Sequence, residues 1–511
     1  MKSLKSNTKK FKEKIIPAYQ TGQDQTLLAD PDVARSILPP GTAIFRDFST
    51  VAPDLPTFIP ENCVGCMECV ISCPDTAILA KVVSEKNIEN APSFLKKNYI
   101  KTTKYYDVYQ KKGQEGGLFN ITVDPQKCKG CAECVTACGE HAALQMIKKD
   151  VKVLKEAQET CSFFNTLPPT PPQFINERLL VDMMLAPRSL LYTGGAGSCM
   201  GCGEGTAIRM MLAATGFTYG EKSCAIVAST GCNTVFSSTY PYNPYLVSWT
   251  NSLFENSPAV AMGIRARWDQ LGSMTLGWKN KKLWVMGGDG AMLDIGFQSL
   301  SRLLMSGMDI NVIILDTQVY SNTGGQASTA SFTSQNAKMS AVGTSLPGKT
   351  ERRKEIGLLS MMHPDVFVAQ TVTAFPNHFY KAIMTANAYP GPAVINVYAP
   401  CPPEHGIRDD LAQHQSKLAV TTRAFPLFIY DPRAGKKIKE RLSLRGNPNP
   451  TEDWAKDPQT GKVLDFISFA KTEGRFSKQF DQDGRPSETL EKAQKDRLDN
   501  WNLLQELGGL K

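Results

Sequence analysis

The chain has 511 residues and a net charge of +8. That length exceeds what one hydrophobic core usually serves, so we expect two or more domains. No apolar run reaches the roughly 18 residues of a membrane span, and the lysine-rich first segment is not followed by the apolar stretch of a secretory signal. We therefore expect a cytoplasmic protein. The basic residues are scattered and not interleaved with aromatic ones, which argues against nucleic acid as a partner.

Five segments differ in composition. Residues 1–55 form an N-terminal extension, residues 56–150 hold two compact cysteine runs, and residues 151–185 contain the proline-rich linker N-T-L-P-P-T-P-P-Q-F. Residues 186–402 have the apolar patterning of a larger domain, and residues 403–511 form a polar C-terminal extension that we expect to lie over a surface. The chain contains 14 cysteines, and without a secretory signal we expect no disulfide framework. Closely spaced reduced thiols indicate metal binding.

Both cysteine runs have the spacing C-x2-C-x2-C-x3-C. The first is Cys63-V-G-Cys66-M-E-Cys69-V-I-S-Cys73, and the second is Cys128-K-G-Cys131-A-E-Cys134-V-T-A-Cys138. In such a run three cysteines bind one four-iron, four-sulfur (4Fe-4S) cluster, and the fourth reaches the neighbouring cluster. We therefore predict one cluster on Cys63, Cys66, Cys69 and Cys138, and another on Cys128, Cys131, Cys134 and Cys73. Zinc ribbons are the alternative, but a zinc site closes with four ligands and needs no duplicated run.

The larger region alternates between strand-like and helix-like patterns. Five apolar runs have the length of strands: CAIVAST, KLWVMGG, NVIILDT, DVFVAQT and AVINVYA. Helix-period segments such as LDIGFQSLSRLLMSG and HFYKAIMTANA separate them. The pattern predicts an α/β domain with a parallel sheet and helices on both faces, beside a small α+β two-cluster domain. Ligands of such a sheet bind at the carboxyl ends of its strands.

One of those strand ends carries the motif G-D-G. Asp289 follows Gly288 at the end of the apolar run KLWVMGG, and Gly290 lets backbone amides come close to a phosphate. A diphosphate would lie at the start of the next helix, and a magnesium ion would bridge it to the Asp289 carboxylate and the loop after the following strand. That loop carries N-T-G-G from Asn322 onward, with one helix and one strand between the two motifs. The pair is typical of a magnesium–thiamine diphosphate site, and the alternative is an ordinary capping aspartate.

Six cysteines lie outside the two runs. Four of them stand in short motifs: Cys199, Cys202, Cys232 and Cys401. Cys232 and Cys401 each come just after a strand-like run, at the same predicted sheet edge as Asp289. We predict that these four converge on a third 4Fe-4S cluster beside the thiazolium ring. Taken singly, each would more often be a buried structural thiol. For Cys161 and Cys224 we expect buried, inert thiols.

In these motifs the chain closely resembles the carboxyl-terminal half of the pyruvate:ferredoxin oxidoreductase family. The resemblance runs from about Gly41, through the ferredoxin-like domain, to F-P-L-F-I-Y-D-P-R near Arg433. In order, its motifs are C-M-G-C-G-E, S-T-G-C-N, N-S-L-F-E-N, G-D-G and V-Y-S-N-T-G-G-Q. It implies Mg2+ ligands at Asp289, Thr317 and the carbonyl of Val319. It also implies catalytic roles for Glu204 and Asn322, with Asn322 helping to hold the substrate. The implied cofactor contacts are Glu204, Cys232, Gly288, Asp289, Gly290, Ala291, Thr317, Gln318, Val319, Tyr320, Ser321 and Asn322.

Single-chain members of that family also have a large amino-terminal half, which supplies the pyrimidine-binding domain, the glutamate that activates the aminopyrimidine and an arginine for the substrate carboxylate. This sequence has no counterpart of that half. The resemblance therefore implies either that the protein is not a complete catalyst or that a second subunit carries the pyrimidine-binding and coenzyme A-related domains, in a dimer of heterodimers.

The expected reaction converts a 2-oxoacid, with pyruvate as the first choice, and coenzyme A into acyl-CoA and CO2. Two electrons pass through the three clusters to ferredoxin or flavodoxin. The alternatives are an oxidoreductase for another 2-oxoacid, such as 2-oxoglutarate or an arylpyruvate, and an electron-relay subunit whose thiamine fold is vestigial. The insert at residues 436–453 has no clear counterpart in the family.

Overall fold

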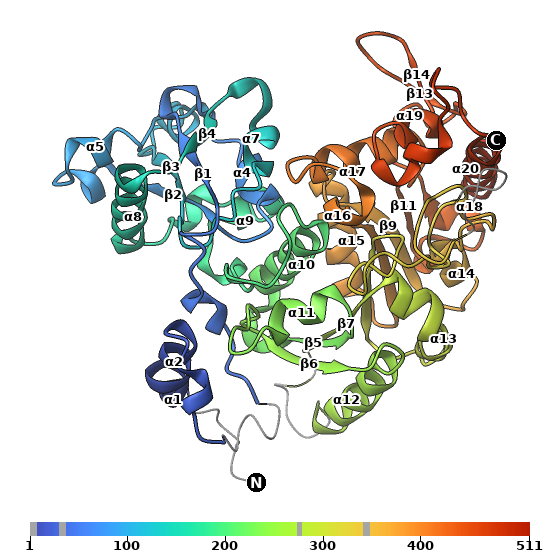
Figure 1. The fold of residues 1–511 in the computed structure, drawn as a ribbon, viewed down its shortest axis with the longest axis horizontal. Coiled ribbons are helices and arrows are strands. Elements are labelled where there is room, and N and C mark those ends of the chain that lie inside the picture. The colour runs from blue at the N-terminus through green and yellow to red at the C-terminus, as the bar shows by residue number, and fades with distance from the viewer. Residues whose placement is uncertain (1–7, 30–36, 273–277, 279, 341–347) are drawn as a thin grey trace.

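The computed structural model describes residues 8–29, 37–272, 278, 280–340 and 348–511. Figure 1 shows a large sheet flanked by helices, with the cysteine-rich region beside it and helix α10 between the two. Within the described residues, no helix is long and apolar enough to cross a membrane.

The N-terminal extension packs against the larger domain. It contains α1 (Thr8–Lys10), a π-helical turn at Phe11–Ile15, and α2 (Ile16–Gln20). Phe11 and Tyr19 make edge-on contacts with the ring of Tyr240, with ring centroids 5.8 Å and 5.3 Å away. These buried aromatic contacts fix the extension to the domain that follows it in the chain.

The cysteine-rich domain, residues 54–148, is built from two antiparallel strand pairs. β1 (Asp54–Phe58) pairs with β4 (Leu144–Lys148), and β2 (Ile78–Val83) pairs with β3 (Leu118–Val123). Two short helices form the second half of each cysteine run, α4 (Glu68–Ser72) and α7 (Glu133–Cys138), and they pack against each other. The segment between β2 and β3 adds α5 (Ser93–Lys96) and α6 (Val108–Gln110). The small α+β domain predicted from the cysteine spacing is thus confirmed.

The predicted linker contains two helices. α8 (Val151–Thr166) begins at Asp150, whose carboxylate accepts a hydrogen bond from the Val153 amide, and α9 (Leu180–Met183) follows. The next helix, α10 (Gly203–Tyr219), is apolar nearly all round and almost completely buried. A helix of that composition belongs inside a core. It packs on the sheet side against α15 and β5, and on the other side against α4 and α9, so one core runs through both regions.

The large sheet has eight strands in the order β12-β11-β9-β10-β8-β7-β5-β6, of which β5 to β10 are parallel. The parallel strands are β5 (Cys224–Ser229), β6 (Ser248–Ser252), β7 (Lys282–Gly288), β8 (Asn311–Asp316), β9 (Phe367–Val372) and β10 (Ala393–Tyr398). The five apolar runs correspond to β5, β7, β8, β9 and β10, which confirms the predicted parallel sheet. Edge strand β6 was missed because its sequence, SWTNS, has no apolar run.

Helices cover both faces of this sheet, as predicted. α10, α11 (Cys232–Ser238) and α15 (Pro376–Ala388) lie on one face, and α12 (Ser257–Gly272), α13 (Phe297–Leu304) and α14 (Ile356–Met361) lie on the other. Alternate residues of β7 enter different hydrophobic cores. Trp284 and Met286 join the core on one face of the sheet, and Leu283 and Val285 join the core on the other face. Burial on both faces explains why these strands appear in the sequence as continuous apolar runs.

The C-terminal extension is more than a surface layer, so that expectation was wrong. β11 (Phe428–Tyr430) pairs antiparallel with β9 inside the large sheet, and β12 (Leu442–Ser443) pairs with β11. Phe466, Phe469 and Phe476 form a buried cluster with Phe332. The remaining elements are α16 (Pro402–His405), α17 (Ala412–Thr421), α18 (Ile438–Arg441), β13 (Ala455–Lys456), β14 (Val463–Leu464), α19 (Phe466–Ala470) and α20 (Glu488–Leu507).

Candidate functional site

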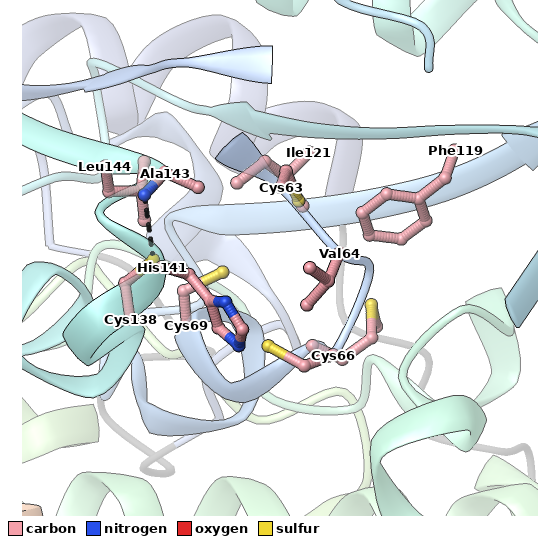
Figure 2. A pocket seen from close by; sticks show the side chains of 11 residues that line it. Cys63, Val64, Cys66, Cys69, Phe119, Ile121, Cys138, His141, Ala143 and Leu144 are labelled. Carbon is pink, nitrogen blue, oxygen red and sulfur yellow. Dashed lines mark hydrogen bonds between the residues drawn. The ribbon is translucent and has the colours of Figure 1, made fainter. Parts of the chain in front are cut away.

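The first cysteine cavity lies beside α4. Figure 2 shows its four cysteine side chains around a space that is otherwise lined mainly by apolar residues such as Val64, Phe119 and Ile121. Its cysteines are Cys63, Cys66, Cys69 and Cys138. Three come from the first run, and the fourth comes from the end of the second run. The Ala143 amide donates a hydrogen bond to the Cys138 sulfur at 3.2 Å (Figure 2).

The second cavity has the reciprocal composition. Its cysteines are Cys73, Cys128, Cys131 and Cys134, and Pro56, Ala77 and Ile78 are among the other lining residues. The Ala77 amide donates to the Cys73 sulfur at 3.3 Å. The structure therefore brings together the same two sets of four thiols that the spacing predicts. Iron binding by these thiols stays a prediction.

The two runs adopt the same strained backbone turn. Gly65 and Met67 have positive φ angles of 74° and 72°, and the equivalent Gly130 and Ala132 have 79° and 66°. A non-glycine residue in the left-handed region costs on the order of 1 kcal/mol or more, and such strain concentrates at functional sites. The turn directs three cysteines of each run to one cavity before the short helix carries the fourth to the other.

The buried thiols of both cavities would be stabilised as thiolates by a positively charged partner. Burial raises the pKa of Cys63 to about 11 and that of Cys128 to about 12, and it raises the pKa of Cys69 well above the ordinary value. A buried thiol in apolar surroundings stays protonated unless a metal or cation stabilises the thiolate. Within the described part of the chain, no three cysteine, histidine or acidic side chains are placed to hold a single metal ion.

A third cavity, of about 180 Å³, contains the four scattered cysteines Cys199, Cys202, Cys232 and Cys401. Cys202 directly precedes α10, and its sulfur accepts a hydrogen bond from the Gly205 amide at 3.4 Å. Cys232 is the first residue of α11 after β5, and Cys401 lies between β10 and α16. Strands β5 and β10 are parallel members of one sheet, with β7 and β8 between them. Their carboxyl ends therefore bring Cys232 and Cys401 to the same edge of the sheet.

Asp289 lies at the same edge, directly after β7. Its carboxylate accepts hydrogen bonds from the amide (3.2 Å) and the hydroxyl (3.1 Å) of Thr317, and another from the Ser328 hydroxyl. The Thr317 hydroxyl is also 3.0 Å from the carbonyl oxygen of Val319. The three oxygens predicted to bind Mg2+ thus lie together. Burial and the nearby charge of Asp316 raise the pKa of Asp289 to about 7, and a cation would relieve that cost.

The cavity next to Asp289 collects nearly all of the predicted thiamine contacts. Its lining includes Glu204, Cys232, Gly288, Asp289, Gly290, Ala291, Thr317, Val319, Tyr320, Ser321 and Asn322. A β-carbon on Gly290 would lie 2.4 Å from the Tyr320 ring, so the close approach of this loop requires glycine. Gln318 does not line the cavity. Its side chain is fully buried, its φ angle is 62°, and its carbonyl accepts hydrogen bonds from Ser331 and Gln335.

The Asp289 cavity and the third cysteine cavity are contiguous. Both are lined by Glu204, Cys232, Thr317, Ser321 and Asn322. Glu204 is buried between them, and one of its carboxyl oxygens has no hydrogen-bond partner among the described residues. Burial, with a smaller effect of the Asp289 charge, raises its pKa to about 8. A buried carboxyl without a full set of partners marks a place for a bound polar group.

A buried network from the C-terminal extension holds the Thr317 loop from behind. The Nε2 atom of His405 lies 2.8 Å from the Thr317 carbonyl oxygen, to which it donates. Glu473 accepts hydrogen bonds from Tyr398 (2.9 Å) and from the Arg475 guanidinium (2.6 Å). Burial holds the pKa of His405 well below its ordinary value, so the ring is neutral. These residues were not predicted, because nothing in the local sequence connects Glu473 or Arg475 to the G-D-G motif.

The two remaining cysteines lie apart from all three cavities. Cys161 is on α8 and Cys224 begins β5, and both are buried. Burial raises the pKa of each thiol to about 12. A reactive cysteine has a depressed pKa, so the expectation of inert thiols stays a prediction that this environment supports.

Comparisons with known proteins identify both domains. Residues 229–397 match the thiamine pyrophosphate enzyme, C-terminal TPP binding domain, and residues 62–142 match the 4Fe-4S dicluster domain. The chain is 29% identical to a probable pyruvate-flavodoxin oxidoreductase of Escherichia coli, over 79% of this chain and 38% of that relative. It is 27% identical to pyruvate:ferredoxin oxidoreductase of Moorella thermoacetica, over 85% of this chain and 41% of that relative. The chain thus spans about two fifths of the length of these curated relatives.

Among solved structures, 2-oxoglutarate:ferredoxin oxidoreductase from Magnetococcus marinus aligns with 41% of this chain and 65% of its own. The sequence identity is 21% and the TM-score is 0.34, so nothing below rests on this likeness.

Proposed function

We propose that the chain is the thiamine- and cluster-bearing subunit of a pyruvate:ferredoxin or pyruvate-flavodoxin oxidoreductase. It combines a thiamine diphosphate-binding domain with a 4Fe-4S dicluster domain, and it is distantly homologous to these enzymes over most of its length. The proposed reaction is the oxidative decarboxylation of pyruvate with coenzyme A to acetyl-CoA and CO2. Its two electrons leave, one at a time, through three 4Fe-4S clusters to ferredoxin or flavodoxin.

One observation carries the proposal: the Asp289 cavity and the third cysteine cavity share five lining residues. A cofactor anchored at Asp289 would therefore lie directly beside a cluster held by Cys199, Cys202, Cys232 and Cys401. Electron transfer from an organic cofactor to a cluster needs such proximity. An electron-relay subunit with a vestigial thiamine fold would not need to keep a buried carboxylate and its hydroxyl partners in this arrangement.

Each residue of the paired cavities has a proposed task. Asp289, Thr317 and the Val319 carbonyl would hold Mg2+, which would supply positive charge for the diphosphate. Thiamine diphosphate supplies the nucleophilic carbon and the electron sink for decarboxylation. Glu204 is placed to exchange a proton or hydrogen bond with the bound cofactor, and Asn322 offers an amide to the substrate.

The first cysteine cavity is proposed as the exit for electrons. Two of its lining residues are exposed, Val64 at 47% and His141. The second cavity has more deeply buried cysteines and adjoins the third through Asp75, Lys129 and Ser198. We propose that electrons pass from the third cavity to the second and then to the first, where an acidic carrier protein can approach.

The active site is proposed to need a second subunit. The relatives are more than twice as long as the matched region, and the Asp289 cavity holds groups for the diphosphate end of the cofactor. A partner carrying the pyrimidine-binding and coenzyme A-related domains would complete it, in a dimer of heterodimers located in the cytoplasm. Within this chain we propose residues 56–150 as the ferredoxin-like domain and residues 186–402 as the thiamine diphosphate domain.

The test is to purify the chain with its co-purifying partner and assay it with coenzyme A and a low-potential acceptor. Pyruvate should be consumed only when coenzyme A is present, and thiamine diphosphate and about 12 irons should be bound per chain. Activity with 2-oxoglutarate or an arylpyruvate in place of pyruvate would assign the other substrate. Absence of thiamine diphosphate from an iron-replete preparation would instead support the electron-relay alternative.

A further inference from the structure

A buried ion pair lies between the second and third cysteine cavities. Lys129, which stands between Cys128 and Cys131 in the second run, places its ammonium nitrogen 2.7 Å from a carboxylate oxygen of Asp75. The exposed fractions of the two side chains are 7% and 3%. A charged lysine at this depth is uncommon and needs a full set of partners.

The remaining partners of Lys129 belong to Ser198, which lies between Gly197 and Cys199 of the third cavity. Its ammonium donates to the backbone carbonyl of Ser198 at 2.7 Å and to the Ser198 hydroxyl oxygen at 2.8 Å. The same hydroxyl donates to Asp75 at 3.2 Å. Ser198 directly precedes Cys199, so one closed set of hydrogen bonds connects the second cavity to the loop that carries Cys199.

The two ends of the pair differ in their contacts. The Lys129 ammonium makes two hydrogen bonds to Ser198, the residue before Cys199 of the third cavity. The Asp75 carboxylate lines the second cavity, two residues after Cys73. Both side chains border the second cavity, and the positive end makes the closer contacts with the loop of the third.

Fixed charges of this kind shift reduction potentials. A reduced cluster carries one more negative charge than the oxidised cluster, so a nearby cation raises the potential and a nearby anion lowers it. The effect is strong in a buried site, where solvent screens poorly.

We propose that the Asp75–Lys129 pair sets the difference in reduction potential between two clusters, with Lys129 raising the potential of the third and Asp75 lowering that of the second. This inference rests on the proposed function, because it requires a cluster in each cavity. The pair makes the third cluster the better electron acceptor beside the thiamine cofactor, and it makes the second cluster a poorer acceptor in the next step.

The test is a potentiometric titration of the iron-replete protein followed by electron paramagnetic resonance. The signal of the third cluster is identified as the one that disappears in Cys401→Ala. In Lys129→Gln its reduction equilibrium constant should fall at least tenfold, which is 59 mV for a one-electron couple. In Asp75→Asn the second cluster should instead become easier to reduce. Lys129→Arg keeps the charge and is the matched control, with a third-cluster potential close to that of the wild type.

Loss of one partner destabilises a buried ion pair, so iron content and thermal unfolding midpoint are measured for every variant. If Lys129→Gln does not fold, the double variant Asp75→Asn/Lys129→Gln removes both charges, and the two potentials should move toward each other. Equal shifts in Lys129→Gln and Lys129→Arg would overturn the inference, as would unchanged potentials in a folded, iron-replete Lys129→Gln or double variant. A wild-type protein with fewer than about 12 irons would contradict the proposed function instead.

Discussion

The replacement Asp289→Asn tests the magnesium site most directly. Asp289 is buried, and its carboxylate lies 3.1 Å from the Thr317 hydroxyl, which in turn lies 3.0 Å from the Val319 carbonyl oxygen. Asparagine has nearly the same shape and keeps one acceptor oxygen for Thr317, but it removes the negative charge. We expect the variant to fold, to keep its iron, and to lose thiamine diphosphate.

The size of the loss follows from the charge. One pair of opposite unit charges about 4 Å apart contributes about 4 kcal/mol at an effective dielectric constant of about 20. Burial raises the pKa of Asp289 to about 7, so ionising it at neutral pH costs less than about 1 kcal/mol of that attraction. About 3 to 4 kcal/mol remains, and we expect the affinity for magnesium–thiamine diphosphate to fall by about two to three orders of magnitude.

Bound thiamine is measured after gel filtration, and its affinity by titration of the cofactor-free protein with saturating Mg2+. Asp309→Asn is the matched control, because Asp309 lies near the other end of β8 and pairs with Lys282 at 3.3 Å, away from the site. Wild-type affinity in Asp289→Asn would refute the magnesium assignment. Loss of iron together with thiamine would show that the variant damages the fold rather than the metal bridge.

Three further changes test other parts of the molecule. Cys232→Ser should remove four of about 12 irons. The control Cys224→Ser, at the other end of β5, should keep all of them. An unchanged iron content in Cys232→Ser would show that the third cluster is misplaced. His405→Leu removes the donor that lies 2.8 Å from the Thr317 carbonyl oxygen and should weaken Mg2+ binding about tenfold in a cofactor titration, with equal affinity arguing against a positioning role. Burial lowers the pKa of His378 from its ordinary 6.5 to about 4, so the folded state loses stability as the pH falls from about 6.5 toward 4. His378→Gln should lose up to about 2 kcal/mol less stability than the wild type between pH 7 and pH 5, compared by urea unfolding at the two pH values, and identical pH dependence would contradict the lowered pKa.

The cysteine runs and the central strands were predictable because their signals are local. Cys63, Cys66 and Cys69 lie in one short loop, where Gly65 and Met67 have positive φ angles. The central strands are buried on both faces, so each appears as a continuous apolar run. Edge strand β6 has no buried face to produce such a run, and it was missed for that reason.

Local signals could not show how the C-terminal extension is used. Its polar composition indicated a surface layer, but Phe428–Tyr430 enters the large sheet and Glu473 and Arg475 are buried behind the Thr317 loop. The two charged residues form an ion pair, and Glu473 also accepts hydrogen bonds from Tyr398 and Gln415. Such pairing allows charged residues inside a core, and it depends on partners that are distant in the sequence.

The sequence by itself determined the types of ligand, the two sets of four cysteines, the parallel strands and the place of Asp289 at a strand end. Only the tertiary structure decided that the Asp289 cavity and the third cysteine cavity share five lining residues, that Gln318 does not line either cavity, and that the Asp75–Lys129 pair lies between two cavities. The physical reason is the range of the interactions. Spacing and periodicity fix a turn or a strand over a few residues, whereas the order of strands in the sheet determines which distant strand ends become neighbours.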